Sequence, residues 1–206
     1  MANVQCRALQ QEFILEVETN LALLDQVVRR SSDFEQRADA AYLLQYAPRS
    51  PRSAKVMVDA LQYALQDQED IVRENAMRSL KAVAVGAKLH PGQQIHIEPT
   101  WFIELMNSVV WSDRRNASLA LVDLTEGRNP ETLQLLRERA LVSVIEMARW
   151  HDLAHALPPF ILAGRLAGLD EKEIRDAWVS GDRESVLERA INPKKKVRPL
   201  KPAAAS

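Results

Sequence analysis

Two histidines four residues apart, His151 and His155, have the spacing in this sequence that most invites a catalytic interpretation. If both stood on one helix, their imidazoles would share a face and could bind one transition-metal ion. The metalloprotease motif of this type carries Glu directly after the first histidine, whereas Asp152 stands there in this chain. No third ligand is evident beyond the carboxylates at 170–173. We therefore expect a structural pair, and we assign no metal, no cofactor and no catalytic residue.

A basic cluster near the C-terminus is the second candidate for chemistry, and its members are Lys194, Lys195, Lys196 and Arg198. Such a run is typical of a short nuclear import signal, or of loose contact with nucleic acid or another acidic surface. The Pro, Lys and Ala residues that follow offer little apolar surface to bury. We therefore expect a folded domain over residues 1–192 and a disordered basic tail over residues 193–206.

The charge of the remaining chain opposes nucleic acid as its main ligand. The whole sequence has a formal net charge of −1, and five of its basic residues follow Pro193. Residues 1–193 therefore carry −6, whereas binding to a phosphate backbone depends on clustered Lys and Arg. We expect nucleic acid to bind only through the tail, if it binds at all.

The number of cysteines and the length of the apolar runs exclude several classes of protein. The single cysteine, Cys6, excludes a disulfide within the chain and a zinc site built from several thiolates. No run of eighteen apolar residues is present, and the N-terminus lacks the apolar core of a signal peptide. We therefore expect a cytoplasmic protein with no membrane partner.

An internal repeat defines the elements that would position these residues. The order Arg, two residues, Ala, three residues, Leu occurs three times, at offsets of 36 and 41 residues: Arg37, Ala40, Leu44; Arg73, Ala76, Leu80; Arg114, Ala117, Leu121. An Asp precedes each copy and can cap a helix, while Ala and Leu share one face that points to the core. A degenerate fourth copy over 150–160 lacks the Arg and contains Pro158 and Pro159, which predicts a helix that starts late or kinks.

Another amphipathic segment precedes each of these helices, which gives one helical hairpin per repeat. The segments are residues 53–66, 99–110 and 130–149, and an N-terminal helix over 9–28 is either continuous or broken around Asn20. Aromatic residues make up only 5% of the chain, which favours an all-α fold over a β-sandwich. Asp170 with Glu173 resembles a capping box, and the helices that follow it predict a C-terminal helical cap.

The repeated Asp, Arg, Ala and Leu pattern, with a period near 40, resembles HEAT repeats over roughly residues 33–165. This resemblance implies an all-α α-solenoid of about four hairpins that binds a protein or peptide along its concave face. The repeated arginines would then bridge acidic groups or carbonyls of neighbouring hairpins. The exposed partner-binding positions implied for the inner helices are Tyr42, Asn75, Arg78, Arg115, Asn116 and His155. We therefore predict a non-catalytic scaffold or interaction module whose protein partner is unknown.

Proteins that resemble HEAT arrays also include alkylpurine DNA glycosylases and bilin lyases, which keeps an enzymatic alternative open. Trp111 and Asp113 are the nearest match to the aromatic and acidic residues that surround an extruded base. Trp101 and Trp111 stand on apolar helical faces, however, and this pattern predicts core positions. A nuclear transport or adaptor protein directed by the basic tail is a further alternative.

The segment 86–99 is longer than a repeat connector needs to be. Insertions of this kind often contact partners, whereas Ile95 and Ile97 predict that the segment folds back and packs. The sequence leaves both interpretations open.

Overall fold

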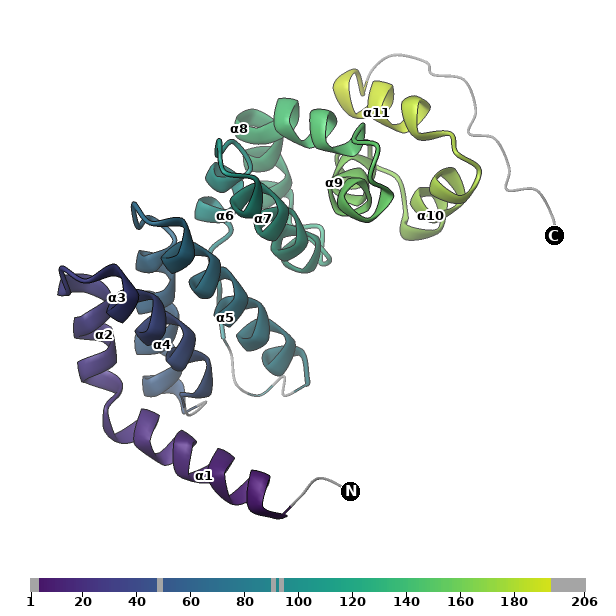
Figure 1. Cartoon of the computed structure of the whole chain (residues 1–206). Helices are drawn as coiled ribbons and strands as arrows, with labels where there is room; N and C mark the ends of the chain where they lie inside the picture. The colour runs from purple at the N-terminus through teal and green to yellow at the C-terminus, as the bar shows by residue number, and fades with distance from the viewer. Residues whose placement is uncertain (1–3, 48–49, 90–91, 93–94, 194–206) are drawn as a thin grey trace. The chain divides into compact units, whose positions relative to one another are not determined.

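The computed structural model describes residues 4–47, 50–89, 92 and 95–193. Over these ranges every regular element is helical, with eleven α-helices, one 3-10 turn and no strand. The chain divides into two compact units, Met1–Trp101 and Phe102–Ser206 (Figure 1). The expectation of an all-α protein is therefore confirmed, and each unit is described by itself.

The first unit is built from sequential helices that pack in pairs. Its elements are α1 (Val4–Thr19), α2 (Leu21–Arg30), α3 (Phe34–Leu43), the 3-10 turn η1 (Leu44–Tyr46), α4 (Pro51–Ala64) and α5 (Asp70–Leu89). Helix α2 packs against both α3 and α4, and α5 packs against both α3 and α4. The main contacts of helix α1 with this body are with α2 and η1. The predicted N-terminal helix is broken, since Asn20 separates α1 from α2.

Local capping explains where these helices begin. The Asp33 carboxylate accepts a hydrogen bond from the Glu35 N–H at 2.9 Å, which satisfies a free donor at the start of α3. Ser50 accepts in the same way at the start of α4, where Pro51 occupies the first helical position. The Asp33 cap agrees with the sequence prediction, whereas α4 begins two residues before the segment predicted over 53–66.

Small residues and polar donors together form the contact between α3 and α5. The repeated alanines Ala40 and Ala76 are 2% and 0% exposed, as their place in the repeat predicts. Two side chains of α5 donate hydrogen bonds to backbone carbonyls of α3: Ser79 Oγ to Ala41 O at 2.8 Å, and Asn75 Nδ2 to Ala38 O at 3.0 Å. These bonds satisfy polar groups that the close helix approach removes from water.

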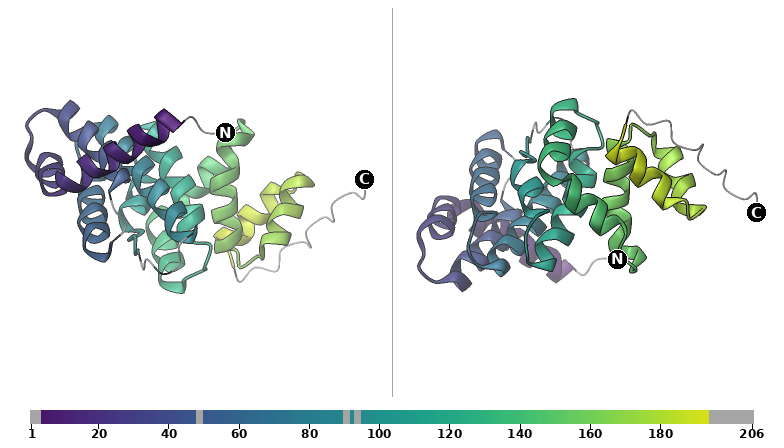
Figure 2. Two further views of the ribbon diagram at one scale, coloured as in Figure 1. Left: turned by 90° about the horizontal axis from the view of Figure 1, so that it is seen from below. Right: turned by 90° about the horizontal axis from the view of Figure 1, so that it is seen from above.

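The second unit contains α7 (Trp111–Leu124), α8 (Pro130–Ala148), α9 (Leu153–Leu166), α10 (Glu171–Val179), α11 (Arg183–Ile191) and most of α6 (Thr100–Leu105). Helix α9 is its centre, because α7, α8, α10 and α11 all pack against it. Helices α10 and α11, in yellow, lie next to α9 in both views of Figure 2. The core on α9 includes Phe160 and Leu162, which are fully buried.

The helix predicted over 99–110 ends early, at Leu105. The chain then turns through hydrogen bonds from Asn107 N to Glu104 O and from Ser108 N to Leu105 O. Ser108 Oγ also accepts from Val110 N at 3.1 Å and donates to Asp113 Oδ2 at 2.7 Å. Such side-chain bonds to nearby groups compete with helix continuation, which explains the shorter element.

Helix α9 keeps both prolines inside a single α-helix. Pro158 and Pro159 have no N–H, so the His155 carbonyl lacks a donor at both i+3 and i+4. Both proline side chains are buried, so packing offsets the lost helical bonds.

The C-terminal helices end and begin as their sequence signals predict. Asp170 and Glu173 form a reciprocal capping box, with both hydrogen bonds at 2.8 Å. Gly168 and Gly181 adopt positive φ angles of 75° and 74°, the left-handed conformation that closes α9 and α10. No helix in the described part of the chain is long and apolar enough to cross a bilayer.

Candidate functional site

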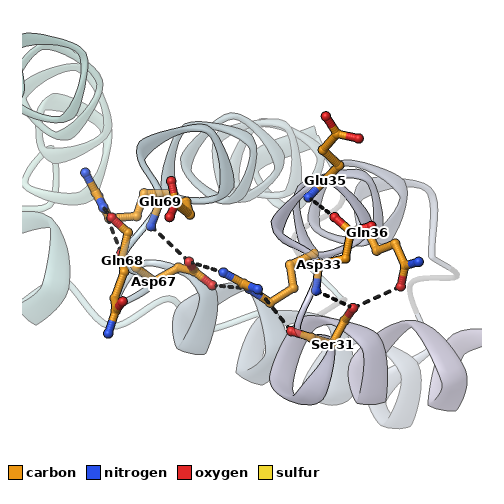
Figure 3. A network of polar contacts seen from close by, with 9 residues as sticks. Ser31, Asp33, Glu35, Gln36, Asp67, Gln68 and Glu69 are labelled. Atoms are coloured by element: carbon orange, nitrogen blue, oxygen red, sulfur yellow. Dashed lines mark hydrogen bonds and ion pairs between the residues drawn. The ribbon is translucent and has the colours of Figure 1, made fainter.

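The first candidate group, the repeated arginines, is occupied by contacts within the protein. Arg37 donates from Nε to Asp67 Oδ2 at 2.7 Å, from Nη2 to Asp67 Oδ1 at 2.9 Å and from Nη1 to Ser31 O at 3.0 Å (Figure 3). Arg73 Nη1 donates to Asp67 O and Gln68 O at 2.7 and 2.8 Å. Both guanidinium groups therefore bind the loop between α4 and α5.

The pair of Arg37 and Asp67 is ionised at neutral pH. Burial raises the pKa of Asp67, but hydrogen bonds from Arg37 and from the Glu69 N–H outweigh it and hold that pKa below 3.8. The hydrogen bonds that Arg37 donates to the Asp67 carboxylate raise the pKa of Arg37 above its ordinary value. In Figure 3 the Asp67 carboxylate accepts from Arg37 and from the Glu69 N–H, while Ser31, Asp33, Glu35 and Gln36 form a neighbouring set of hydrogen bonds.

Arg114 has the equivalent role in the second unit. Its Nη2 binds Glu146 Oε2 at 2.8 Å, and its guanidinium lies 5.3 Å from the centre of the Trp150 ring. Arg37 and Arg114 thus each bind an acidic residue about thirty positions later, near the end of the helix that precedes the next repeat. The prediction that the repeated arginines bridge neighbouring hairpins is confirmed for Arg37 and Arg114, whereas Arg73 donates to carbonyls of the loop directly before its own helix.

Two further arginines of this kind were absent from the sequence prediction. Arg165 of α9 is 5% exposed and binds Val122 O, Thr125 Oγ1 and Glu171 Oε1, which joins α7, α9 and α10. Arg137 of α8 donates to Leu166 O and Ala190 O in the last turns of α9 and α11. Cations stabilise helix C-termini in this way. Neither residue stands in the repeat motif, so the repeat gave no signal for them.

Two of the predicted partner-binding residues lie outside any shared surface feature. Asn75 is half-buried, and its amide is bound to Ala38 O. Arg115, Asn116 and His155 are half-buried as well, so the expectation of exposed side chains is corrected at these four positions. Arg78 is exposed and pairs with Glu74 one turn earlier at 2.8 Å. An error of one position in the alignment of the repeats rotates the predicted side chain by about 100° around the helix, which moves it to another face.

Tyr42 belongs to an aromatic group at the edge of the first unit. Its ring centre lies 6.1 Å from that of Tyr46, which in turn makes an edge contact of 5.1 Å with Phe13 of α1. The two tyrosine hydroxyls are 3.4 Å apart, and this hydrogen bond raises the pKa of Tyr46 above 10.0. Tyr42 and Phe13 remain about 40% exposed, so the group both holds α1 and faces solvent.

A second group, here called the Trp111 surface, brings together three of the predicted residues. It consists of Trp111, Arg115 and Asn116 of α7 with His155 of α9. The Arg115 guanidinium lies 5.7 Å from the centre of the Trp111 ring, and Arg115 Nη1 is 3.4 Å from Asn116 Oδ1. The His155 ring meets Trp111 edge to face at 4.9 Å. These are favourable aromatic and cation–π geometries.

Helix geometry and a cap together place these groups. Trp111 and Arg115 are four residues apart on α7 and therefore share a face, while the packing of α9 on α7 brings His155 opposite them. Asp152 caps α9 by accepting from the Ala154 and His155 N–H groups at 2.9 and 3.1 Å. Its second oxygen lies 3.3 Å from His155 Nδ1, which orients the imidazole.

The sequence expectation for Trp111 itself was wrong. Trp111 is 50% exposed and Trp101 is 37% exposed, although both were expected in the core. Each stands in the first turn of its helix, where no preceding turn covers it. Asp113, its partner in the glycosylase alternative, is 0% exposed and accepts the Ser108 hydroxyl.

The two histidines are not presented on one helix. Helix α9 begins at Leu153, so His151 lies before the Asp152 cap and is exposed, whereas His155 is half-buried against Trp111. Within the ranges that the structure describes, no three His, Cys, Asp or Glu side chains are grouped as metal ligands.

The segment 86–99 contributes to a cavity in the first unit. Ile97 is buried, and Gln62 Nε2 of α4 donates to Glu98 O at 3.3 Å, so this part of the segment folds back on α4. A cavity of about 450 Å³ lies between them, lined mainly by residues of α4, Gly92, Ile95, His96 and Glu98. The packing interpretation holds for the described residues of the segment. The basic cluster Lys194, Lys195, Lys196 and Arg198 lies outside the described residues, so its role stays a prediction.

Comparison with known proteins finds similar solved structures but no matching family. No family model matches the sequence, and no curated protein matches it. The crystal structure of an engineered protein from the Northeast Structural Genomics Consortium is similar, with a TM-score of 0.52 and 16% sequence identity. The match covers 82% of this chain and 77% of that chain. At this identity the likeness supports the helical fold alone.

Proposed function

We propose that this protein is a non-catalytic interaction module that binds a protein partner through the Trp111 surface. We further propose the architecture of a HEAT-like array, with hairpins α2/α3, α4/α5, α6/α7 and α8/α9 followed by the cap α10/α11. The regular spacing of the bonds from Arg37 to Asp67 and from Arg114 to Glu146 supports a repeated unit. A cytoplasmic location remains part of this proposal, on the basis of the single cysteine.

The observation that carries the proposal is the half-exposed indole of Trp111 between a guanidinium and an imidazole. Trp and Arg are the residues most enriched at the energetic centres of protein interfaces, because they offer large contact area with few rotatable bonds or several donors. Asn116 holds Arg115 and Asp152 holds His155, so both polar side chains next to Trp111 are positioned before a partner binds. Such preorganisation lowers the entropic cost of binding.

The chemistry of the Trp111 surface suits recognition better than base excision. Asp113, the acid that the glycosylase alternative needs beside Trp111, is buried and hydrogen-bonded to Ser108. Asp152, the exposed carboxylate nearest to His155, already caps α9. We therefore keep the binding function, while the bilin lyase and tail-directed adaptor alternatives stay predictions.

Site-directed photocrosslinking tests the proposed function. The photoreactive residue p-benzoylphenylalanine replaces Trp111, and in a matched control it replaces Val142, an exposed residue of α8 in the same unit. Irradiation in cells of the source organism should give a discrete protein adduct from position 111 and none from position 142. Equal labelling from both positions, or no adduct from position 111, would count against the Trp111 surface as a docking site.

A further inference from the structure

We propose that the Trp111 surface selects an acidic, hydrophobic peptide segment, with a carboxylate on Arg115 and an adjacent aliphatic or aromatic side chain on Trp111. This inference rests on the proposed function and adds the chemical class of the partner.

Arg115 carries a positive charge with no carboxylate partner among the described residues. Five other arginines of the same unit do pair with a carboxylate: Arg114 with Glu146, Arg128 and Arg165 with Glu171, Arg139 with Glu104 and Arg149 with Glu184. Arg115 has no carboxylate within 4.0 Å in the described residues, and its hydrogen-bond acceptor is the neutral amide of Asn116. The Trp111 ring holds this guanidinium in place. A carboxylate from a partner would therefore complete a charged pair without displacing an existing one.

The apolar part of the site is the Trp111 ring, whose centre lies 5.7 Å from this cation and which is 50% exposed. Val109 and Leu153, each two residues before a member of the site in the sequence, are also exposed. Burying the Trp111 ring next to Arg115 is favourable for a ligand that carries a large apolar side chain close to its carboxylate.

A nucleic-acid strand also offers anions and flat rings, but the charge of the unit disfavours it. Residues 102–193 contain eleven Lys and Arg against fifteen Asp and Glu, a net charge of −4. Asp152 lies next to His155 on the same surface. A strand that brings one phosphate per nucleotide would meet this excess of carboxylates, whereas a peptide needs a single anion at Arg115.

A selection experiment tests the ligand class on the full-length protein. A random dodecapeptide display library is selected on the immobilised protein, and the affinity of enriched peptides is measured by fluorescence anisotropy. We expect Asp or Glu within one or two positions of Leu, Phe or Trp in the enriched peptides. Enrichment of basic or uncharged peptides, or no enrichment at all, would overturn the proposal.

Charge reversal then separates a specific contact from general stickiness. R115E should weaken the acidic peptide at least tenfold, and a peptide with Lys in place of its acid should bind R115E better than the wild type. R175E changes charge equally at an exposed position of α10 in the same unit and should leave affinity unchanged. R115Q serves as a second variant, and thermal unfolding of both establishes that they fold. Unchanged peptide affinity in R115E, or tighter binding of a twenty-residue oligothymidine than of any peptide, would refute the ligand class.

The two proposals fail in different ways. If position 111 crosslinks to a partner but the selected peptides show no acidic preference, the docking site stands and the ligand class is wrong. If peptides show the preference but position 111 yields no adduct in cells, the chemistry of the surface stands and its role in docking a protein is wrong.

Discussion

Arg37 of α3 and Asp67 in the loop after α4 are joined by two parallel hydrogen bonds of 2.7 and 2.9 Å. The pair links residues thirty positions apart, and the carbonyl of the same Asp67 receives Arg73 of α5. One loop residue therefore connects two repeats of the first unit. Because the Asp67 side chain is 9% exposed, this connection is protected from much of the screening that weakens surface ion pairs.

Removing the charge of Asp67 should destabilise the first unit markedly. Asp67→Asn keeps the shape but leaves the Arg37 guanidinium largely buried without a counter-ion, at a cost of roughly 3 kcal/mol. Urea unfolding followed by circular dichroism measures this cost. Glu74→Gln, which breaks the exposed pair with Arg78, is the control and should cost less than about 0.5 kcal/mol. Similar losses in the two variants would contradict the central role of Asp67.

Acid should weaken the same link. The pKa of Asp67 is lowered in the folded state, so its stabilising effect is complete above its unfolded value, near 3.8, and is lost as pH falls through the folded value. Between neutral pH and pH 5 this residue should contribute no pH dependence. Below about pH 4, wild-type stability should fall more steeply than that of Asp67→Asn. Parallel stability curves for the two proteins down to pH 2 would argue against the lowered pKa.

Ala76 should tolerate no larger side chain. It is 0% exposed at the contact of α5 with α3, so Ala76→Leu should overpack the unit and cost on the order of 1–3 kcal/mol. Ala82→Leu places the same side chain at an exposed position of the same helix and should be nearly neutral. Thermal unfolding compares the two variants. Wild-type-like melting of Ala76→Leu would show that the helix contact is looser than the structure indicates.

Gly164 should be required for the approach of α10 to α9. A Cβ at this position would lie 2.5 Å from Cγ1 and 2.8 Å from Cδ1 of Ile174, which is 2% exposed. Gly164→Ala gains helix propensity of about 1 kcal/mol, but the overpacking cost should exceed it and leave a net loss of about 1 kcal/mol. Combining it with Ile174→Ala relieves the overlap, so unfolding of the double variant should reveal a favourable coupling. Additive effects would mean that the helices adjust freely.

The sequence predicted helix positions well where local chemistry decides them. Asp33 and the pair of Asp170 and Glu173 act within one helical turn, so their roles need no knowledge of distant residues. The burial of Ala40 and Ala76 followed from the repeat, because periodicity identifies the face of a helix. The same reasoning failed over 106–110, where bonds of Asn107 and Ser108 to distant and nearby groups replace the last helical turns.

Candidate sites depended much more on the tertiary structure. Repeat phase selected Tyr42, Arg115 and His155 among residues that are at least partly accessible, but it also selected Asn75, whose amide is bound to α3. The sequence pattern placed Trp111 in the core, because we assumed that another helix packs against every apolar helical face. Whether such a face is covered depends on helices that pack there, and the first turn of α7 is left half open.

The sequence by itself determined the all-α class, the repeated arginines and the main helix boundaries, because all three depend on residue types at short, regular spacing. Only the tertiary structure decided that Asp113 is buried, that Arg165 joins three helices, and that His155 meets Trp111 across two of them. Those contacts join residues about 40 positions apart in the chain. Their geometry depends on how α7 and α9 pack, which periodicity along a single helix does not specify.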